Sequence, residues 1–121
     1  MPPSSVSDDP PVRDLNIRRP YFDWIARGTK TVEVRVAYPK MRGLQTGHQI
    51  RFVSGSDGCL TVVRRVTVYT SFEEMLRAED PKSIAPDISS PDELLNLIRT
   101  IYPPEKEALG VLAIEIERVD R

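Results

Sequence analysis

The sequence has little of what metal centres, disulfide scaffolds and membrane proteins require. Its 121 residues include a single cysteine, Cys59, and a single histidine, His48. One cysteine excludes an intrachain disulfide and a thiolate zinc cluster, and one histidine cannot build a His-rich metal site. No apolar run is long enough to span a membrane. We therefore expect a protein without metal or cofactor that resides in a reducing cytoplasm and not at a membrane.

Signature motifs of several enzyme classes are also missing. The chain contains no GxGxxG, GxxxxGK[ST], HExxH or GxSxG, which argues against dinucleotide-binding, P-loop, zinc-protease and α/β-hydrolase chemistry. A Ser-His-Asp triad is still possible by residue count, but His48 follows a turn and is interpreted as an ordinary exposed residue. Cys59, at the start of a strand pattern, is interpreted as a small buried residue.

Length and composition predict one folded domain with a tail. Residues 1–12 are rich in proline, serine and aspartate, which favours a flexible tail without the basic and apolar regions of a secretory signal. Residues 13–121 are expected to form a single domain.

The net charge of −1 hides an asymmetry along the chain. Residues 13–65 carry eleven Lys/Arg against four Asp/Glu, a net of +7, whereas residues 66–121 carry six against twelve, a net of −6. A basic front half favours a surface that contacts phosphates. The alternative is that the two halves interleave in space and cancel.

Hydrophobic periodicity predicts strands and helices in an irregular order. Strands are predicted at 14–18, 29–36, 48–54, 59–70 and 111–119, with a hairpin turn at 54–58. Helices are predicted at 20–28, 71–80 and 90–102, the last two opening on capping boxes, with a loop at 81–89 and one helical turn at 105–109. Because strands and helices do not alternate regularly, we expect an α+β fold: a small mixed or antiparallel β-barrel decorated by short helices, with the C-terminal strand closing the barrel.

Three details of this scheme test the local pattern. In the first helix, Phe22 and Ile25 should face the core with Tyr21 beside them, while Trp24 packs in the core or stacks on a ligand. In the strand at 59–70, Leu60, Val62, Val66 and Val68 would share a face with Arg64, which predicts a bulge or an arginine pointing into a polar cleft. The strand at 111–119 should have one core face and one solvent face.

The segment GTKTVEVR carries three charges within a strand pattern. Glu33 and Arg35 are two residues apart and fall on one face, opposite Val32, Val34 and Val36. Such a carboxylate–guanidinium pair can hold itself ionised and contact a ligand. Lys30 follows the turn at Gly28, so its direction is open. A solvated strand face with a surface ion pair is the alternative.

These residues resemble the signature GxKxxExR of the ASCH domain, a relative of the PUA RNA-binding fold. The match consists of Gly28, Lys30, Glu33 and Arg35, and the resemblance covers about 14–119 because three further segments are similar in order and length: YFDWIARG, TGHQIRF and IYPPEKEALGVLAIEIERV.

The resemblance implies a β-barrel with a cleft that binds RNA or a nucleotide. Lys30, Glu33 and Arg35 would line this cleft, with Gly28 permitting close approach. A base could stack on Trp24, Tyr38 or Tyr69, and Arg64 is a further ligand-binding candidate.

Two other functions remain open at this point. One is a hydrolase: either a ribonuclease with Lys30 and Glu33 as base and acid, or a nucleoside amidohydrolase, since some ASCH-like proteins hydrolyse N4-acetylcytidine, and this resemblance adds Asp87 as the acidic partner. In that comparison Glu33 replaces a threonine. The other is a protein-interaction module that uses the acidic half of the chain.

Overall fold

The computed structural model describes residues 12–88 and 90–119. The predicted tail lies outside these residues except for Val12. The strands are β1 (Val12–Asn16), β2 (Val32–Val36), β3 (Gln49–Ser54), β4 (Asp57–Tyr69) and β5 (Val111–Arg118). The helices are α1 (Arg19–Arg27), α2 (Phe72–Ala78), α3 (Pro81–Ile84), α4 (Pro91–Ile101) and α5 (Pro104–Glu107), with a 3₁₀ turn, η1 (Pro39–Met41).

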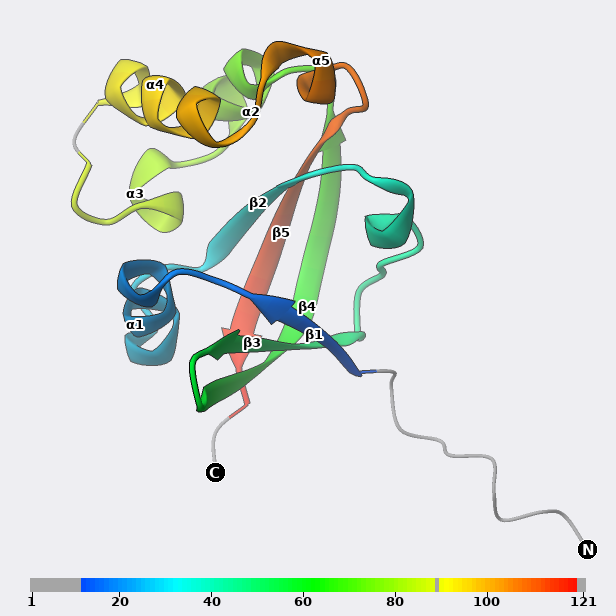
Figure 1. The fold of residues 1–121 in the computed structure, drawn as a ribbon, viewed down its shortest axis with the longest axis vertical. Coiled ribbons are helices and arrows are strands. Elements are labelled where there is room, and N and C mark those ends of the chain that lie inside the picture. Colours follow the sequence, from blue (N-terminus) through cyan, green and yellow to red (C-terminus); the bar gives the residue numbers. More distant parts are fainter. Residues whose placement is uncertain (1–11, 89, 120–121) are drawn as a thin grey trace, which may run out of the picture.

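The strands form one five-stranded sheet in the order β1-β3-β4-β5-β2. β1 pairs with β3 in parallel and the other neighbours are antiparallel. The sheet curls into a half-barrel, with α1 at one end and the remaining helices gathered at the other (Figure 1). The α+β fold class is thus confirmed. The expected closure by the C-terminal strand is wrong, because β5 lies inside the sheet and leaves β1 and β2 as its edges.

Local signals in the sequence set most helix ends. Gly28 ends α1 in the left-handed conformation with φ of 81°, where its N–H bonds back to the last turn. The hydroxyls of Ser71 and Ser90 accept from the amides of Glu74 and Glu93, as the predicted caps require. The loop expected at 81–89 was partly wrong: the Asp80 carboxylate caps a short helix, α3.

Side chains pack into two clusters, one on each face of the central strands. Inside the half-barrel lie residues such as Ile50, Phe52 and Ile114, all fully buried. The second cluster, which we call the helix-covered cluster, lies between the sheet and helices α2, α3 and α4. It includes Ala113, which is fully buried. The solvent face expected for the C-terminal strand is therefore wrong in its first half, since helices from elsewhere in the chain cover it.

The predicted bulge in β4 is confirmed. The register against β5 shifts between Val63 and Arg65, so Arg64 is the extra residue. The shift changes which side chains point inward: Thr61 and Val63 are fully buried, so Leu60 and Val62 do not share the inner face with Val66 as predicted. Arg64 is exposed and pairs with Glu117.

Over the two described ranges, no helix combines the length and the apolar character needed to cross a membrane.

Candidate functional site

Lys30, Glu33 and Arg35 form one connected ion cluster at the edge strand β2. The Nζ atom of Lys30 lies 3.2 Å from Oε1 of Glu33, and Nε of Arg35 lies 2.6 Å from Oε2 of the same carboxylate. The side chains of Lys30 and Glu33 are 3% and 8% exposed, whereas that of Arg35 is 21% exposed. The carboxylate is therefore held between two cations, and only the outer cation faces solvent.

Lys30 is fixed by three acceptors. Besides the Glu33 carboxylate, its Nζ donates to the carbonyl oxygens of Val32 at 2.7 Å and Ile84 at 2.8 Å. Three acceptors match the three N–H bonds of an ammonium, whereas a neutral amine has only two. The direction that the sequence left open is thus inward, and the lysine ties α3 to β2.

The pKa shifts follow from burial and mutual attraction. Burial lowers the pKa of Lys30, although the nearby Glu33 acts in the opposite sense. Burial by itself would raise the pKa of Glu33, but the charges of Lys30 and Arg35 outweigh it and hold that pKa below its usual value. Glu33 is consequently a stable carboxylate.

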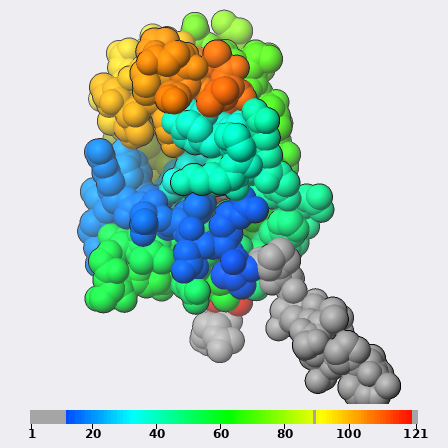
Figure 2. All heavy atoms as spheres, turned by 45° about the vertical axis from the view of Figure 1, so that its right-hand side comes forward, coloured from blue at the N-terminus to red at the C-terminus, as the bar shows by residue number. Residues whose placement is uncertain are grey.

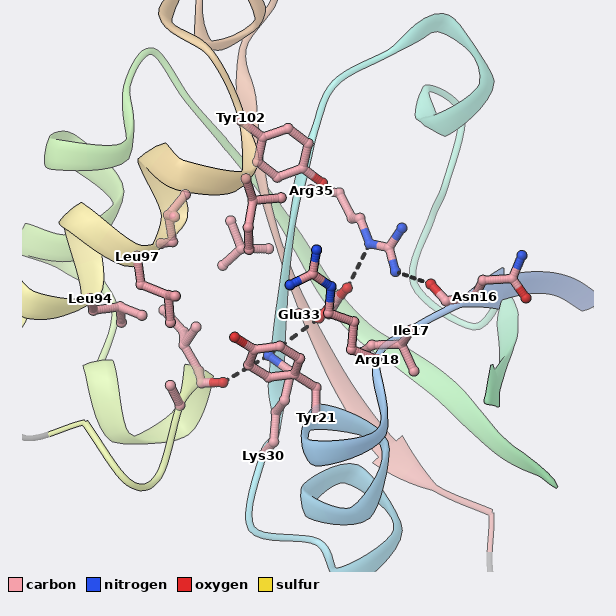
Figure 3. A pocket seen from close by; sticks show the side chains of 15 residues that line it. Asn16, Ile17, Arg18, Tyr21, Lys30, Glu33, Arg35, Leu94, Leu97 and Tyr102 are labelled. Atoms are coloured by element: carbon pink, nitrogen blue, oxygen red, sulfur yellow. Dashed lines mark hydrogen bonds and ion pairs between the residues drawn. The ribbon is translucent and has the colours of Figure 1, made fainter. Parts of the chain in front are cut away.

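A pocket of about 190 Å³ opens beside this cluster. One wall is aliphatic and comes from α4, with Leu94 and Leu97, while the other carries the ion cluster and the side chains of Arg18 and Tyr21 (Figure 3). Its lining comprises Asn16, Ile17, Arg18, Tyr21, Lys30, Glu33, Val34, Arg35, Ile84, Ala85, Leu94, Leu97, Ile98, Ile101 and Tyr102. Mostly apolar walls with a few convergent polar groups are typical of ligand sites.

The pocket occupies the place where the half-barrel fails to close. β2 is one edge of the sheet, and the chain leaving β1, the other edge, supplies Asn16 and Arg18. Arg35 spans this gap, since its Nη2 donates to the carbonyl oxygen of Asn16 at 3.0 Å (Figure 3). The open sheet thus leaves room for the pocket, and Arg35 bridges the two edges at one side of it.

Three further residues proposed as ligand contacts, Gly28, Trp24 and Tyr38, lie away from this pocket. Gly28 ends α1, and a Cβ there would meet only the Arg118 side chain, at 3.5 Å. Trp24 packs against the helix-covered cluster, and its carbonyl accepts from the amide of Lys30. Tyr38 is packed against the same cluster, with the ammonium of Lys106 located 5.7 Å from its ring centroid. None of Gly28, Trp24 and Tyr38 lines the pocket.

Arg64, Tyr69 and Asp87 lie outside the lining as well. Arg64 pairs with Glu117 on the surface, and the Tyr69 hydroxyl donates to Glu79 at 2.6 Å. Asp87 is exposed in the turn after α3. It lies near the rim, because its charge adds to the effect of burial, the main cause that raises the pKa of the pocket residue Tyr21.

Sequence reasoning missed most of the pocket lining, since only Lys30, Glu33 and Arg35 were among its candidates. Tyr21, expected beside Ile25 in the core, instead lines the pocket, with its ring centroid 5.9 Å from the Lys30 ammonium. The wall from α4 was also missed. The sequence did contain a signal for this wall, because the apolar surface of α4 is wider than core packing needs. Besides the buried Leu94 and Ile98, the helix carries Leu97 and Ile101, and Ile101 is 43% exposed.

Cationic side chains continue from the pocket along β1 and the segment after β2. Among the residues that the structure describes, Arg13, Arg18, Lys40 and Arg42 make no ion pair, and we call them the basic band. Arg13 donates to the carbonyl oxygen of Lys40 at 2.9 Å, which holds the two segments together. Figure 2 shows them side by side on one face, in blue and cyan.

Two arginines of the basic half, Arg64 and Arg65, pair with carboxylates of the acidic half. Arg65 bonds Glu79 with two nitrogens and also bonds Glu115, and Arg64 pairs with Glu117. Both interpretations of the charge asymmetry are thus partly correct, because these arginines are neutralised by the acidic half whereas the basic band is not. In the described part of the chain, no group of three or more histidine, cysteine or acidic side chains is placed to hold a metal ion.

Comparisons with known proteins agree on one family. The model of the ASCH domain matches residues 15–120. The crystal structure of hypothetical protein PH0355 is similar, with 32% identity over 89% of this chain and 99% of that chain and a TM-score of 0.82. Protein PF0455 from Pyrococcus furiosus has 31% identity over 91% and 99% of the two chains, with a TM-score of 0.74.

A more distant structure supports the fold alone. The ASCH domain from Lactobacillus crispatus JV V101 has 16% identity over 95% of this chain and 87% of that chain, with a TM-score of 0.68. No curated protein sequence matches the chain.

Proposed function

The chain belongs to the ASCH domain family, which is thought to bind RNA, and we propose that it is a binding module for single-stranded RNA or a nucleotide. A base would enter the pocket beside Lys30, Glu33 and Arg35, and the phosphates would follow the basic band. The observation that carries the proposal is the pocket itself, which joins an aliphatic wall to a cationic rim. Single-stranded RNA is commonly bound by inserting an unstacked base and neutralising its backbone.

The two cations of the ion cluster have different roles in this proposal. Lys30 has no N–H left for a ligand, because all three have acceptors within the protein. Its role is to hold Glu33 in place. Arg35 retains Nη1, and Arg18 makes no ion pair in the described chain, so these two guanidinium groups are the ones that contact the nucleotide.

The same contacts favour binding over hydrolysis. Lys30 would have to give up an acceptor before it could act as a base or nucleophile, and both oxygens of Glu33 already accept from cations. We therefore expect no release of acetate from N4-acetylcytidine. Turnover by the wild-type protein that Lys30→Met abolishes, at a temperature at which circular dichroism shows the variant folded, would overturn this part of the proposal in favour of a hydrolase.

The test of binding is the fluorescence anisotropy of a 5′-labelled single-stranded RNA octamer at several salt concentrations. If all four cations of the basic band contact phosphates, log K falls against log salt with a slope of about −3. Arg18→Ala should weaken binding and make the slope shallower by about 0.7. Arg77→Ala removes the same charge from an exposed site on α2 and is the matched control. Equal affinities for the two variants would contradict the proposal.

A further inference from the structure

The outer edge of β2, beside the pocket, carries backbone groups that no hydrogen bond within the sheet uses. β2 is an edge strand and pairs with β5 alone. The pattern is fixed by two bonds at its ends, from the Ile116 amide to Thr31 O and from the Ala37 amide to Gly110 O, both 2.9 Å. Odd-numbered residues therefore bond β5, and the amide and carbonyl groups of Val32, Val34 and Val36 point away from it.

Of these three residues, Val34 is the one whose groups are both available. The Val32 carbonyl accepts from Lys30, and the Val36 carbonyl accepts from the amide of Tyr38 at 2.8 Å. Within residues 12–88 and 90–119, neither the amide nor the carbonyl of Val34 has a hydrogen-bond partner. Val34 also lines the pocket, although its side chain packs into the helix-covered cluster.

An extended peptide is a poor occupant for this edge. Adding a strand requires bonds at alternate residues, here positions 32, 34 and 36, and two of the three carbonyls are already taken. A single residue with one donor and one acceptor instead matches a compact ligand that carries an acceptor and a donor on adjacent atoms.

The pocket is large enough for a ligand with a flat ring. A cavity of about 150 Å³ can hold benzene, so a pocket of about 190 Å³ takes a six-membered heterocycle between the aliphatic wall and Tyr21. We propose that the pocket takes one nucleobase and that the Val34 amide and carbonyl bind its hydrogen-bonding edge. Uracil offers O4 and N3–H to such a pair, and cytosine offers N3 and the N4 amine.

This inference rests on the proposed function, and it predicts a dependence on the hydrogen-bonding edge of the base that contacts with the RNA phosphates alone cannot give. RNA of uridines should bind about tenfold more tightly than RNA of 3-methyluridines, since losing a matched hydrogen bond costs about that factor. Free uridine should bind, and 3-methyluridine, which lacks the N3 donor, should bind about tenfold more weakly.

The test compares Val34→Pro with Val34→Ala by anisotropy on octamers of uridine and of 3-methyluridine. Proline removes the amide but is tolerated on the outer side of an edge strand, whereas alanine keeps the amide and shortens the same side chain. We expect Val34→Ala to keep the uridine preference and Val34→Pro to lose it while retaining salt-dependent RNA binding. If Val34→Pro does not fold by circular dichroism, calorimetry of the wild-type protein with uridine and 3-methyluridine decides.

The possible failures are distinguishable. RNA binding with equal affinities for uridine and 3-methyluridine would overturn the role of the Val34 amide and carbonyl and leave the proposed function intact. The absence of binding to any octamer or nucleoside would overturn the proposed function and this inference together.

Discussion

Replacing Lys30 with methionine should destabilise the protein strongly. The substitution keeps most of the side-chain volume but removes the ammonium, so Glu33 remains a carboxylate whose side chain is 8% exposed and which keeps only Arg35 as a charged partner. The carbonyls of Val32 and Ile84 lose their donor at the same time. Removing one partner of a buried ion pair costs about 3–5 kcal/mol, because the other charge stays buried without full compensation.

The corresponding shift in melting temperature follows from the size of the chain. An unfolding entropy of about 2.1 cal/mol/K per residue gives about 0.25 kcal/mol/K for this length, so Tm falls by about 12–20 °C. Thermal unfolding followed by circular dichroism, with urea titration for the free energy of unfolding, measures the change. Lys82→Met, at an exposed position on α3, is the matched control and should shift stability by no more than about 0.5 kcal/mol.

A second variant tests whether the uncompensated carboxylate of Glu33 causes the loss of stability. Lys30→Met combined with Glu33→Gln should be more stable than Lys30→Met alone, because the double variant no longer buries an uncompensated carboxylate. Equal Tm values for Lys30→Met and Lys82→Met, or a double variant less stable than Lys30→Met, would refute the reasoning.

Two further predictions concern acid stability and the end of α1. Glu33 and Glu79 have pKa values below the usual 4.5, so each binds fewer protons when folded, and the stability they contribute above pH 4.5 is lost as pH falls through the folded pKa values. The urea midpoint should therefore drop between pH 6 and pH 3, less so in Glu33→Gln, and an unchanged midpoint would contradict the assignment. Gly28→Ala should lower the free energy of unfolding by about 1–2 kcal/mol, because φ is 81° there. Gly58→Ala, where φ is not positive, should cost less, and equal losses in urea titrations would count against the backbone explanation.

Much of the local structure followed from the sequence because the relevant interactions are short-range. Ser71 and Ser90 cap helices three residues from the amides they bond, and Gly28 stops a helix through its own backbone conformation. The pairing of Glu33 with Arg35 was predictable for the same reason, since residues two apart on a strand share a face. The bulge was indicated by Arg64, a charge in an otherwise apolar row.

The errors came from packing between distant segments. Ala113 was assigned to solvent because the pattern of the last strand does not reveal that helices cover its second face. The order of the strands could not be predicted from the sequence of any single strand either. A strand such as β5 can pair on both sides, and its position between β4 and β2 leaves the half-barrel open.

The sequence by itself determined most of the helices and strands, the family and the presence of a charged pair on one strand, because these depend on residue type and spacing. Only the tertiary structure decided that Lys30 points inward, since its acceptor at Ile84 is 54 residues away and binds across space. The same holds for the pocket. Its aliphatic wall on α4 and the exposed edge at Val34 meet because the sheet stays open there, and no spacing within β2 encodes that gap.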